Sequence, residues 1–170
     1  MNDDTVISQD AINTAVWNAC DTFRGTVDPS IYKDYVLTML FLKYVSDVWQ
    51  DHYDHYKAQY GDHPELIAEM LKNERFVLPA SASFYALHTL RHTPGNGERI
   101  DKALHAIEEA NLAKLRDVFQ DISFNSTKLG DEEKLEKIEP LIGDGWFPLS
   151  LAGGRRLQSV RYIADEVMVM

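Results

Sequence analysis

The sequence predicts a mainly α fold, a helical bundle around one long central helix with little or no sheet. Two observations support this prediction. Residues 28–60 contain no Gly, and no Pro after Pro29, so they can form one unbroken helix of roughly 30 residues. Other segments carry apolar residues at helical spacing and are separated by turn-forming residues at 61, 93–97 and 124–130. The rest of the chain is expected to pack around the central helix.

The central helix is expected to begin with Asp28 as its N-cap and Pro29 as its first helical residue, the preferred pair at a helix start. Only Thr38 and Lys43 interrupt the apolar run of residues 35–45. A helix that is apolar on nearly every face is covered by partners on several sides. We therefore predict that this half of the helix lies at the centre of the bundle.

The second half of the same helix carries a polar stripe. Side chains three and four residues apart share a helix face, so one set of polar residues lines up from position 43 onward. The set comprises Lys43, Ser46, Asp47, Gln50 and Asp54. We expect this stripe to face solvent, so that the helix starts buried and ends on the surface.

Shorter helices are predicted before and after the central one in the sequence, at residues 8–24, 63–75, 98–111 and 131–139. Either Ser81 or Ser83 is expected to cap a further helix that runs through Arg91. In the helix at 98–111 the spacing predicts one buried stripe, formed by Ile100, Ala103, Leu104 and Ile107. The opposite stripe, which is expected to face solvent, is formed by Asp101, Lys102, His105 and Glu109.

Composition places the chain among ordinary globular proteins. It has 170 residues, a formal net charge of −10 and a single cysteine, Cys20. The negative charge argues against nucleic-acid binding through bulk charge, while a local basic patch remains compatible with it. One cysteine excludes an internal disulfide and indicates a reducing compartment. With no signal-peptide core and no apolar run long enough for a bilayer, a soluble cytoplasmic protein without membrane contact is predicted.

Sequence motifs for chemistry are largely missing. His52 with His55, and His88 with His92, have spacings that can share a metal, but neither pair includes the glutamate of an H-E-x-x-H site. Packed or surface histidines are therefore favoured, with a histidine metal site as a minor hypothesis. The PGNGERI segment at 94–100 lacks the third glycine of a dinucleotide fingerprint, and there is no Walker A motif and no G-x-S-x-G motif. The residues alone predict no reaction.

Three segments resemble a known family. They are VWNACDTFRGTVDPSIYKDYVLTMLFLKYVSDVW at 16–49, IDKALHAIEEAN at 100–111 and FNSTKLG at 124–130. Their most characteristic parts are FRG at 23–25, YKDYVL at 32–37 and FLKYVSD at 41–47. The chain is similar, over about residues 8–142, to the N-terminal region of the modification subunit of type I restriction-modification systems.

The resemblance implies a helical domain that precedes a Rossmann-like catalytic domain. In that family the catalytic domain transfers a methyl group from S-adenosylmethionine to the N6 amine of adenine in DNA. Two modification subunits associate with one specificity subunit, a restriction subunit joins the full complex, and the helical domains help to close the complex around DNA. The present sequence has no Asn-Pro-Pro-aromatic motif and no glycine-rich cofactor loop. We therefore expect no catalytic, cofactor-binding or metal-binding residues in this chain, with S-adenosylmethionine implied for the intact subunit only.

The matching segments also suggest a domain division and contact residues. Residues 1–148 are expected to form the helical N-terminal domain, and 149–170, which match the family poorly, a tail or junction. Polar residues of these segments and the basic residues near the C-terminal end are expected to contact DNA or other subunits: Arg24, Lys33, Lys43, Asn125, Ser126, Lys128, Arg155 and Arg156.

Most of these contact residues also have a structural interpretation. For Lys43 the favoured one is an exposed i,i+4 ion pair with Asp47, worth a few tenths of a kcal/mol. Arg24 can bind carbonyl groups at a helix C-terminus, and Asn125 and Ser126 are ordinary turn formers. Arg155 and its basic neighbours can simply solubilise a chain end.

Two functional hypotheses follow. The first is an assembly and DNA-clamping domain of an adenine-specific DNA methyltransferase subunit. The second is a free-standing helical adaptor without enzymatic activity, which holds a protein partner through an exposed apolar patch.

Overall fold

The computed structural model describes residues 29–125, together with residues 10, 13, 14, 17, 18, 21 and 142. The elements with defined bounds are, in chain order, α2 (Pro29–Tyr60), α3 (Pro64–Lys72), the 3-10 turn η1 (Ala80–Ala82), α4 (Phe84–Thr89), α5 (Asn96–Ala110) and α6 (Leu112–Leu115). The described residues contain no strand, which confirms the predicted mainly α fold. The helix predicted at 131–139 lies outside the described residues.

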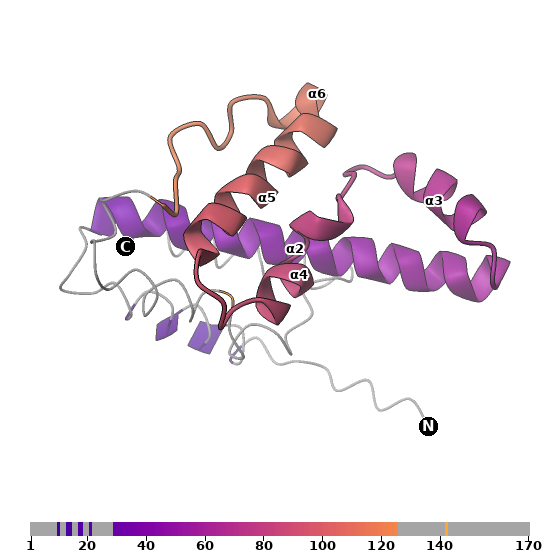
Figure 1. Cartoon of the computed structure of the whole chain (residues 1–170), viewed down its shortest axis with the longest axis horizontal. Coiled ribbons are helices and arrows are strands. Elements are labelled where there is room, and N and C mark those ends of the chain that lie inside the picture. Colours follow the sequence, from indigo (N-terminus) through magenta and orange to yellow (C-terminus); the bar gives the residue numbers. More distant parts are fainter. Residues whose placement is uncertain are drawn as a thin grey trace.

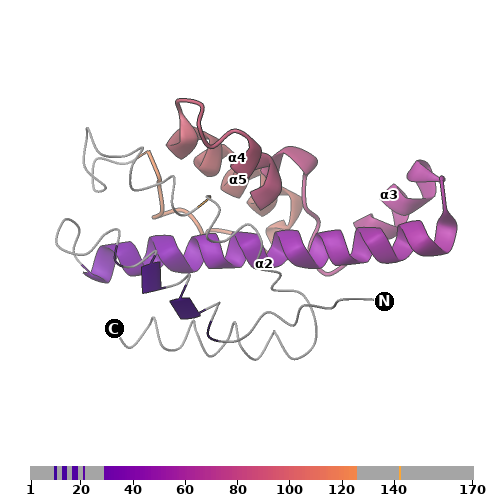
Figure 2. The same ribbon diagram turned by 90° about the horizontal axis from the view of Figure 1, so that it is seen from below.

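Helix α2 is the axis of the molecule. Its 32 residues extend for about 48 Å, and Figures 1 and 2 show it running along the length of the fold. It begins at Pro29 and ends where Gly61 adopts a φ of 63°, a left-handed conformation that suits glycine. The predicted extent of the central helix is confirmed, although the proposed cap Asp28 lies outside the described residues. After Gly61 the chain reverses, and α3 packs beside the C-terminal half of α2 (Figure 1).

The hydrophobic core lies between the first half of α2 and the helices α4 and α5, which lie against one side of it (Figure 2). From α2 it includes Tyr35, Val36, Met39, Leu40, Leu42 and Val45, and from α5 all four residues of the predicted stripe, Ile100, Ala103, Leu104 and Ile107. Burial of each large side chain stabilises the fold by about 1.5–3 kcal/mol. The predicted central position of residues 35–45 is confirmed.

The polar stripe of α2 is only partly where the sequence predicted it. Asp54 is exposed, but Lys43, Ser46 and Asp47 are 0%, 1% and 3% exposed. The prediction that this part of the stripe faces solvent is wrong, because α4 packs over it. A helical pattern shows which side chains share a face, but not whether another helix covers that face.

Local side-chain hydrogen bonds hold the shorter elements in place. Ser83, rather than Ser81, caps α4, since its hydroxyl oxygen accepts a bond of 3.1 Å from the N–H of Ala86. Asn111, just after α5, accepts from the backbone N–H of Val77 at 2.8 Å and donates to the Val77 carbonyl at 2.7 Å. It thus ties the segment before α4 to the end of α5. None of the helices in the described part is long and apolar enough to cross a membrane.

Candidate functional site

Three of the eight predicted contact residues lie in the described part of the chain. Lys33 is half-buried in the first turns of α2, Lys43 is buried near its middle, and Asn125 is exposed just after Phe124. The others, Arg24, Ser126, Lys128, Arg155 and Arg156, lie outside the described residues. Two clusters of side chains give structural roles to residues in several of the family-like segments.

The first cluster is centred on Lys43. Its ammonium group donates to both carboxylate oxygens of Asp47, at 2.6 and 2.7 Å, and the two side chains are 0% and 1% exposed. The interpretation as an exposed ion pair is therefore wrong, since neither charge reaches solvent. A direct contact between Lys43 and DNA or another subunit would require its side chain to leave Asp47.

Helix α4 completes this cluster. The hydroxyl group of Tyr85 donates to Asp47 and accepts a 3.3 Å bond from Lys43, while Ser46 accepts a 2.8 Å bond from the backbone N–H of Phe84. The Lys43 nitrogen also lies 5.4 and 5.1 Å from the ring centroids of Phe84 and Tyr85. We call Lys43, Ser46, Asp47 and Tyr85 the buried polar cluster. It joins α2 to α4 through groups whose burial would be costly if they were left unpaired.

Burial shifts the pKa values of two members of the cluster in the expected directions. Desolvation lowers the pKa of the Lys43 ammonium, and its attraction to Asp47 and hydrogen bonds with that carboxylate oppose this shift. Desolvation also raises the pKa of the Tyr85 phenol, and here the hydrogen bond to Asp47 acts in the same direction. Tyr85 is therefore suited to remain a neutral hydrogen-bond donor, not to act as a base.

The second cluster holds the start of the FNSTKLG segment. Asp101 of α5 accepts hydrogen bonds from the Ser123 hydroxyl at 2.7 Å, the Phe124 N–H at 2.7 Å and the Asn125 N–H at 3.3 Å. Bonds to a carboxylate are stronger than those between neutral groups. Although Asp101 was predicted to face solvent, it is half-buried against this turn.

Two further elements converge on the same turn. The Tyr35 hydroxyl donates to the Ser123 carbonyl at 2.9 Å, and its ring contacts the fully buried Phe124 ring edge-on at 4.9 Å between centroids. A Cβ atom on Gly97 would lie 2.5 Å from the Phe124 carbonyl oxygen, so only glycine allows this close approach. We call Tyr35, Gly97, Asp101, Ser123 and Phe124 the loop anchor. It fixes the backbone immediately before the exposed Asn125.

The first testable prediction concerns the Asp101 carboxylate. Asp101→Asn keeps the size of the side chain but removes its charge and one of its two acceptor oxygens. We expect the free energy of unfolding to fall by about 2 kcal/mol, and the amide hydrogens of Phe124 and Asn125 to exchange faster with solvent. Urea unfolding and hydrogen exchange resolved by residue measure these two effects.

Asp121→Asn is the matched control, because Asp121 is exposed and its side chain makes no hydrogen bond or ion pair with the residues that the structure describes. We expect this change to alter stability by less than about 0.5 kcal/mol. Equal effects of the two substitutions would show that Asp101 does not hold the turn.

Sequence reasoning missed Tyr85 and the role of Asp101 in the two clusters. Tyr85 carried no signal, since a tyrosine in a short helix is ordinary. Asp101 carried a weak sequence signal, because it lies inside the family-like IDKALHAIEEAN segment. Its position on the helix, however, predicted that it would face solvent. Both act on partners that are distant in the sequence.

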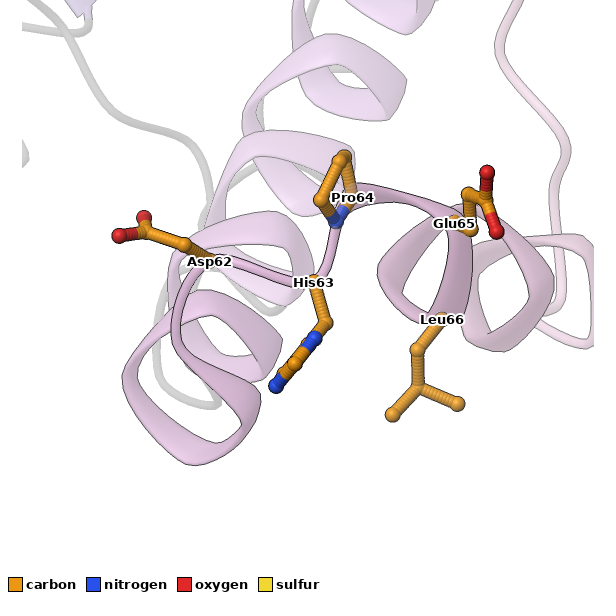
Figure 3. Close-up of a pocket in the computed structure, with 5 residues that line it drawn as sticks. All are labelled: Asp62, His63, Pro64, Glu65 and Leu66. Carbon is orange, nitrogen blue, oxygen red and sulfur yellow. The ribbon is translucent and has the colours of Figure 1, made fainter.

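The other concave and titratable features found among the described residues do not form a chemical site. A pocket of about 400 Å³ at the turn between α2 and α3 is lined by Asp62, His63, Pro64, Glu65 and Leu66. In Figure 3 the carboxylate groups of Asp62 and Glu65 point away from each other, so the polar groups do not converge. Within the described residues no three His, Cys, Asp or Glu side chains are placed to hold a metal. The two histidine pairs thus lack a third ligand there.

A family model matches the part of the chain that contains these segments. The model of the HsdM N-terminal domain matches residues 12–142, which is most of the chain. The chain belongs to the HsdM N-terminal domain family, the helical N-terminal domains of type I restriction-modification methyltransferase subunits. Of the two clusters, the buried polar cluster uses the FLKYVSD segment, and the loop anchor uses YKDYVL, IDKALHAIEEAN and FNSTKLG.

A solved structure with the same fold supports this assignment. The type I restriction-modification system methyltransferase subunit from Streptococcus thermophilus is similar, with a TM-score of 0.72 and 23% sequence identity. The match covers 95% of this chain and 39% of that one, so this chain spans about two fifths of the subunit's length. At this identity the likeness establishes the fold. None of the curated proteins compared with the chain matches it.

Proposed function

We propose that this chain is the assembly and DNA-clamping domain of a type I restriction-modification methyltransferase subunit. The loop anchor is the observation that carries the proposal, because it binds the start of one family-like segment to two others and leaves Asn125 exposed beside it. Rigid presentation of a polar turn suits contact with a partner surface. Neither cluster offers a cofactor cradle or an activated nucleophile.

In this proposal, the methyl-transfer activity belongs to polypeptide outside this domain. In this proposal the intact subunit transfers a methyl group from S-adenosylmethionine to the N6 amine of adenine, and the helical domain, residues 1–148, supplies contacts. Its partners are DNA, a specificity subunit, a second modification subunit and, in the full complex, a restriction subunit. Of the predicted contact residues, we retain Arg24, Lys33, Asn125, Ser126, Lys128, Arg155 and Arg156 as candidates.

Hydrogen exchange on the assembled complex tests this proposal. The intact methyltransferase subunit that carries this domain is measured alone, with its specificity subunit, and then with a duplex that contains the recognition site. We expect slower exchange at the loop anchor and around Asn125 when the specificity subunit or DNA is added. Protection by the specificity subunit without further protection by DNA would restrict the role to assembly. Unchanged exchange throughout residues 29–125 would contradict the proposal and favour an adaptor for another partner.

A further inference from the structure

Three lysines in the described part of the chain are paired with nearby carboxylates, whereas one group of exposed cations is not. Lys43, Lys72 and Lys102 lie 2.6–2.7 Å from Asp47, Glu69 and Glu98. By contrast, Arg75, Lys114 and Arg116 are exposed, and none of the three makes an ion pair with a carboxylate in the described part of the chain. In a protein with a net charge of −10, such a group is unexpected.

Two of these cations share one aromatic support. The Arg75 guanidinium carbon lies 5.7 Å, and the Lys114 nitrogen 5.5 Å, from the centroid of the Phe76 ring. The Lys114 ammonium also donates to the Arg75 carbonyl oxygen. Figure 1 shows how the chain between α3 and α4 brings this segment close to α6, although the two are far apart in sequence. The charges of Arg75 and Lys114 are therefore held together on one surface.

The support is itself fixed by the core. The Phe76 ring contacts Phe41 edge-on at 6.0 Å between centroids, and Asn111 pairs with the backbone of the next residue, Val77. Beyond α6, the Glu108 carboxylate accepts a 3.0 Å bond from the Asp117 N–H and so fixes the turn that follows Arg116. A surface whose charges are held in position loses little entropy when it binds a ligand.

Two of the four carboxylates nearest in sequence to these cations are bonded to other groups. Glu74 is bonded to Tyr56 and lies 3.1 Å from His52, while Glu108 holds the turn after α6. Asp117 and Asp121 are exposed, and neither forms an ion pair with the three cations. Their negative charges reduce the positive potential of this surface.

We infer that Arg75 and Lys114, which lie over Phe76, together with the exposed Arg116 two residues after Lys114, form a cationic ridge that contacts the phosphate backbone of duplex DNA. The inference rests on the proposed function and names a surface for its DNA contact. Three cations on one ridge match a row of phosphates, and their contacts would be independent of base sequence.

Salt-dependent binding tests the cationic ridge. The 170-residue chain is titrated into a fluorescently labelled 30-bp duplex at several salt concentrations starting from low salt, and anisotropy gives the binding constant. Each phosphate contact contributes about 0.9 to the slope of log K against log salt. We expect Arg75→Ala/Lys114→Ala/Arg116→Ala to reduce that slope by about 2–3 and to weaken binding at low salt at least tenfold.

A charge-matched control separates the ridge from bulk charge. Lys57→Ala/Lys72→Ala/Lys102→Ala removes the same charge from other exposed positions and is expected to change the slope by less than about 1. Because loss of Lys114 also removes its bond to the Arg75 carbonyl, the double variant Arg75→Gln/Arg116→Gln is measured too, with an expected slope change of about 2.

Several outcomes would overturn the inference: equal effects of the two triple variants, no binding of the unaltered chain at low salt, or preferential displacement of the DNA by poly-L-glutamate. The last result would assign the ridge to an acidic protein. If DNA still slows hydrogen exchange elsewhere in the domain of the assembled complex, the proposed function survives and only the assignment of the ridge fails.

Discussion

Asp47→Ala is expected to lower the free energy of unfolding by about 3–5 kcal/mol, the largest effect of any single polar substitution in this fold. The change leaves the fully buried Lys43 ammonium without its carboxylate and the Tyr85 hydroxyl without its acceptor. A buried charge without a partner cannot be solvated, so the folded state loses far more than the value of a surface ion pair. Urea unfolding followed by circular dichroism measures the change.

A variant that removes all the charges separates this explanation from simple loss of contacts. Lys43→Met/Asp47→Leu/Tyr85→Phe replaces three of the four polar side chains of the cluster with apolar ones of similar size and leaves Ser46 in place. Since the exchange of a buried ion pair for well-packed apolar groups is often neutral, we expect the triple variant to be more stable than Asp47→Ala by at least about 2 kcal/mol. If the triple variant is instead the less stable of the two, the ion pair is itself a net source of stability.

Phe124→Ala is expected to destabilise the fold by about 3–5 kcal/mol, because it removes a fully buried ring and leaves a cavity. The ring is 0% exposed and packs edge-on against Tyr35, so its loss also weakens the contact between α2 and the turn at Ser123 and Phe124. The same unfolding experiment gives the magnitude. We also expect faster amide exchange at Ser123 and Asn125 than in the unaltered chain.

Val118→Ala provides the control for this second prediction. Val118 is close in sequence but 51% exposed, so its truncation should change the stability by less than about 0.5 kcal/mol. A loss of less than about 1 kcal/mol for Phe124→Ala would mean that the buried ring does not hold the start of the FNSTKLG segment on the core.

Much of the fold follows from local sequence rules. Pro29 and Gly61 mark the ends of α2 because one favours a helix start and the other allows a left-handed end. The apolar run between them requires cover, and α4 and α5 supply it on one side of α2. The buried stripe of α5 was likewise predicted from the helical spacing of its apolar residues.

The two clusters depend on contacts that local rules do not contain. Lys43 and Asp47 form an i,i+4 pair that can be exposed or buried, and the difference is made by Tyr85, 42 residues after Lys43. Asp101 likewise binds groups 22–24 residues further along the chain. A pattern on one helix records which face is polar, whereas burial of that face is decided by a distant segment.

The central claim is that this domain supplies contacts, while methyl transfer resides in the rest of the subunit. The most direct test measures the transfer of labelled methyl groups from S-adenosylmethionine to duplex DNA by the purified 170-residue chain. The complete methyltransferase subunit with its specificity subunit serves as the positive reference. We predict no transfer above background by the chain alone. Transfer to adenine by these 170 residues would contradict the account.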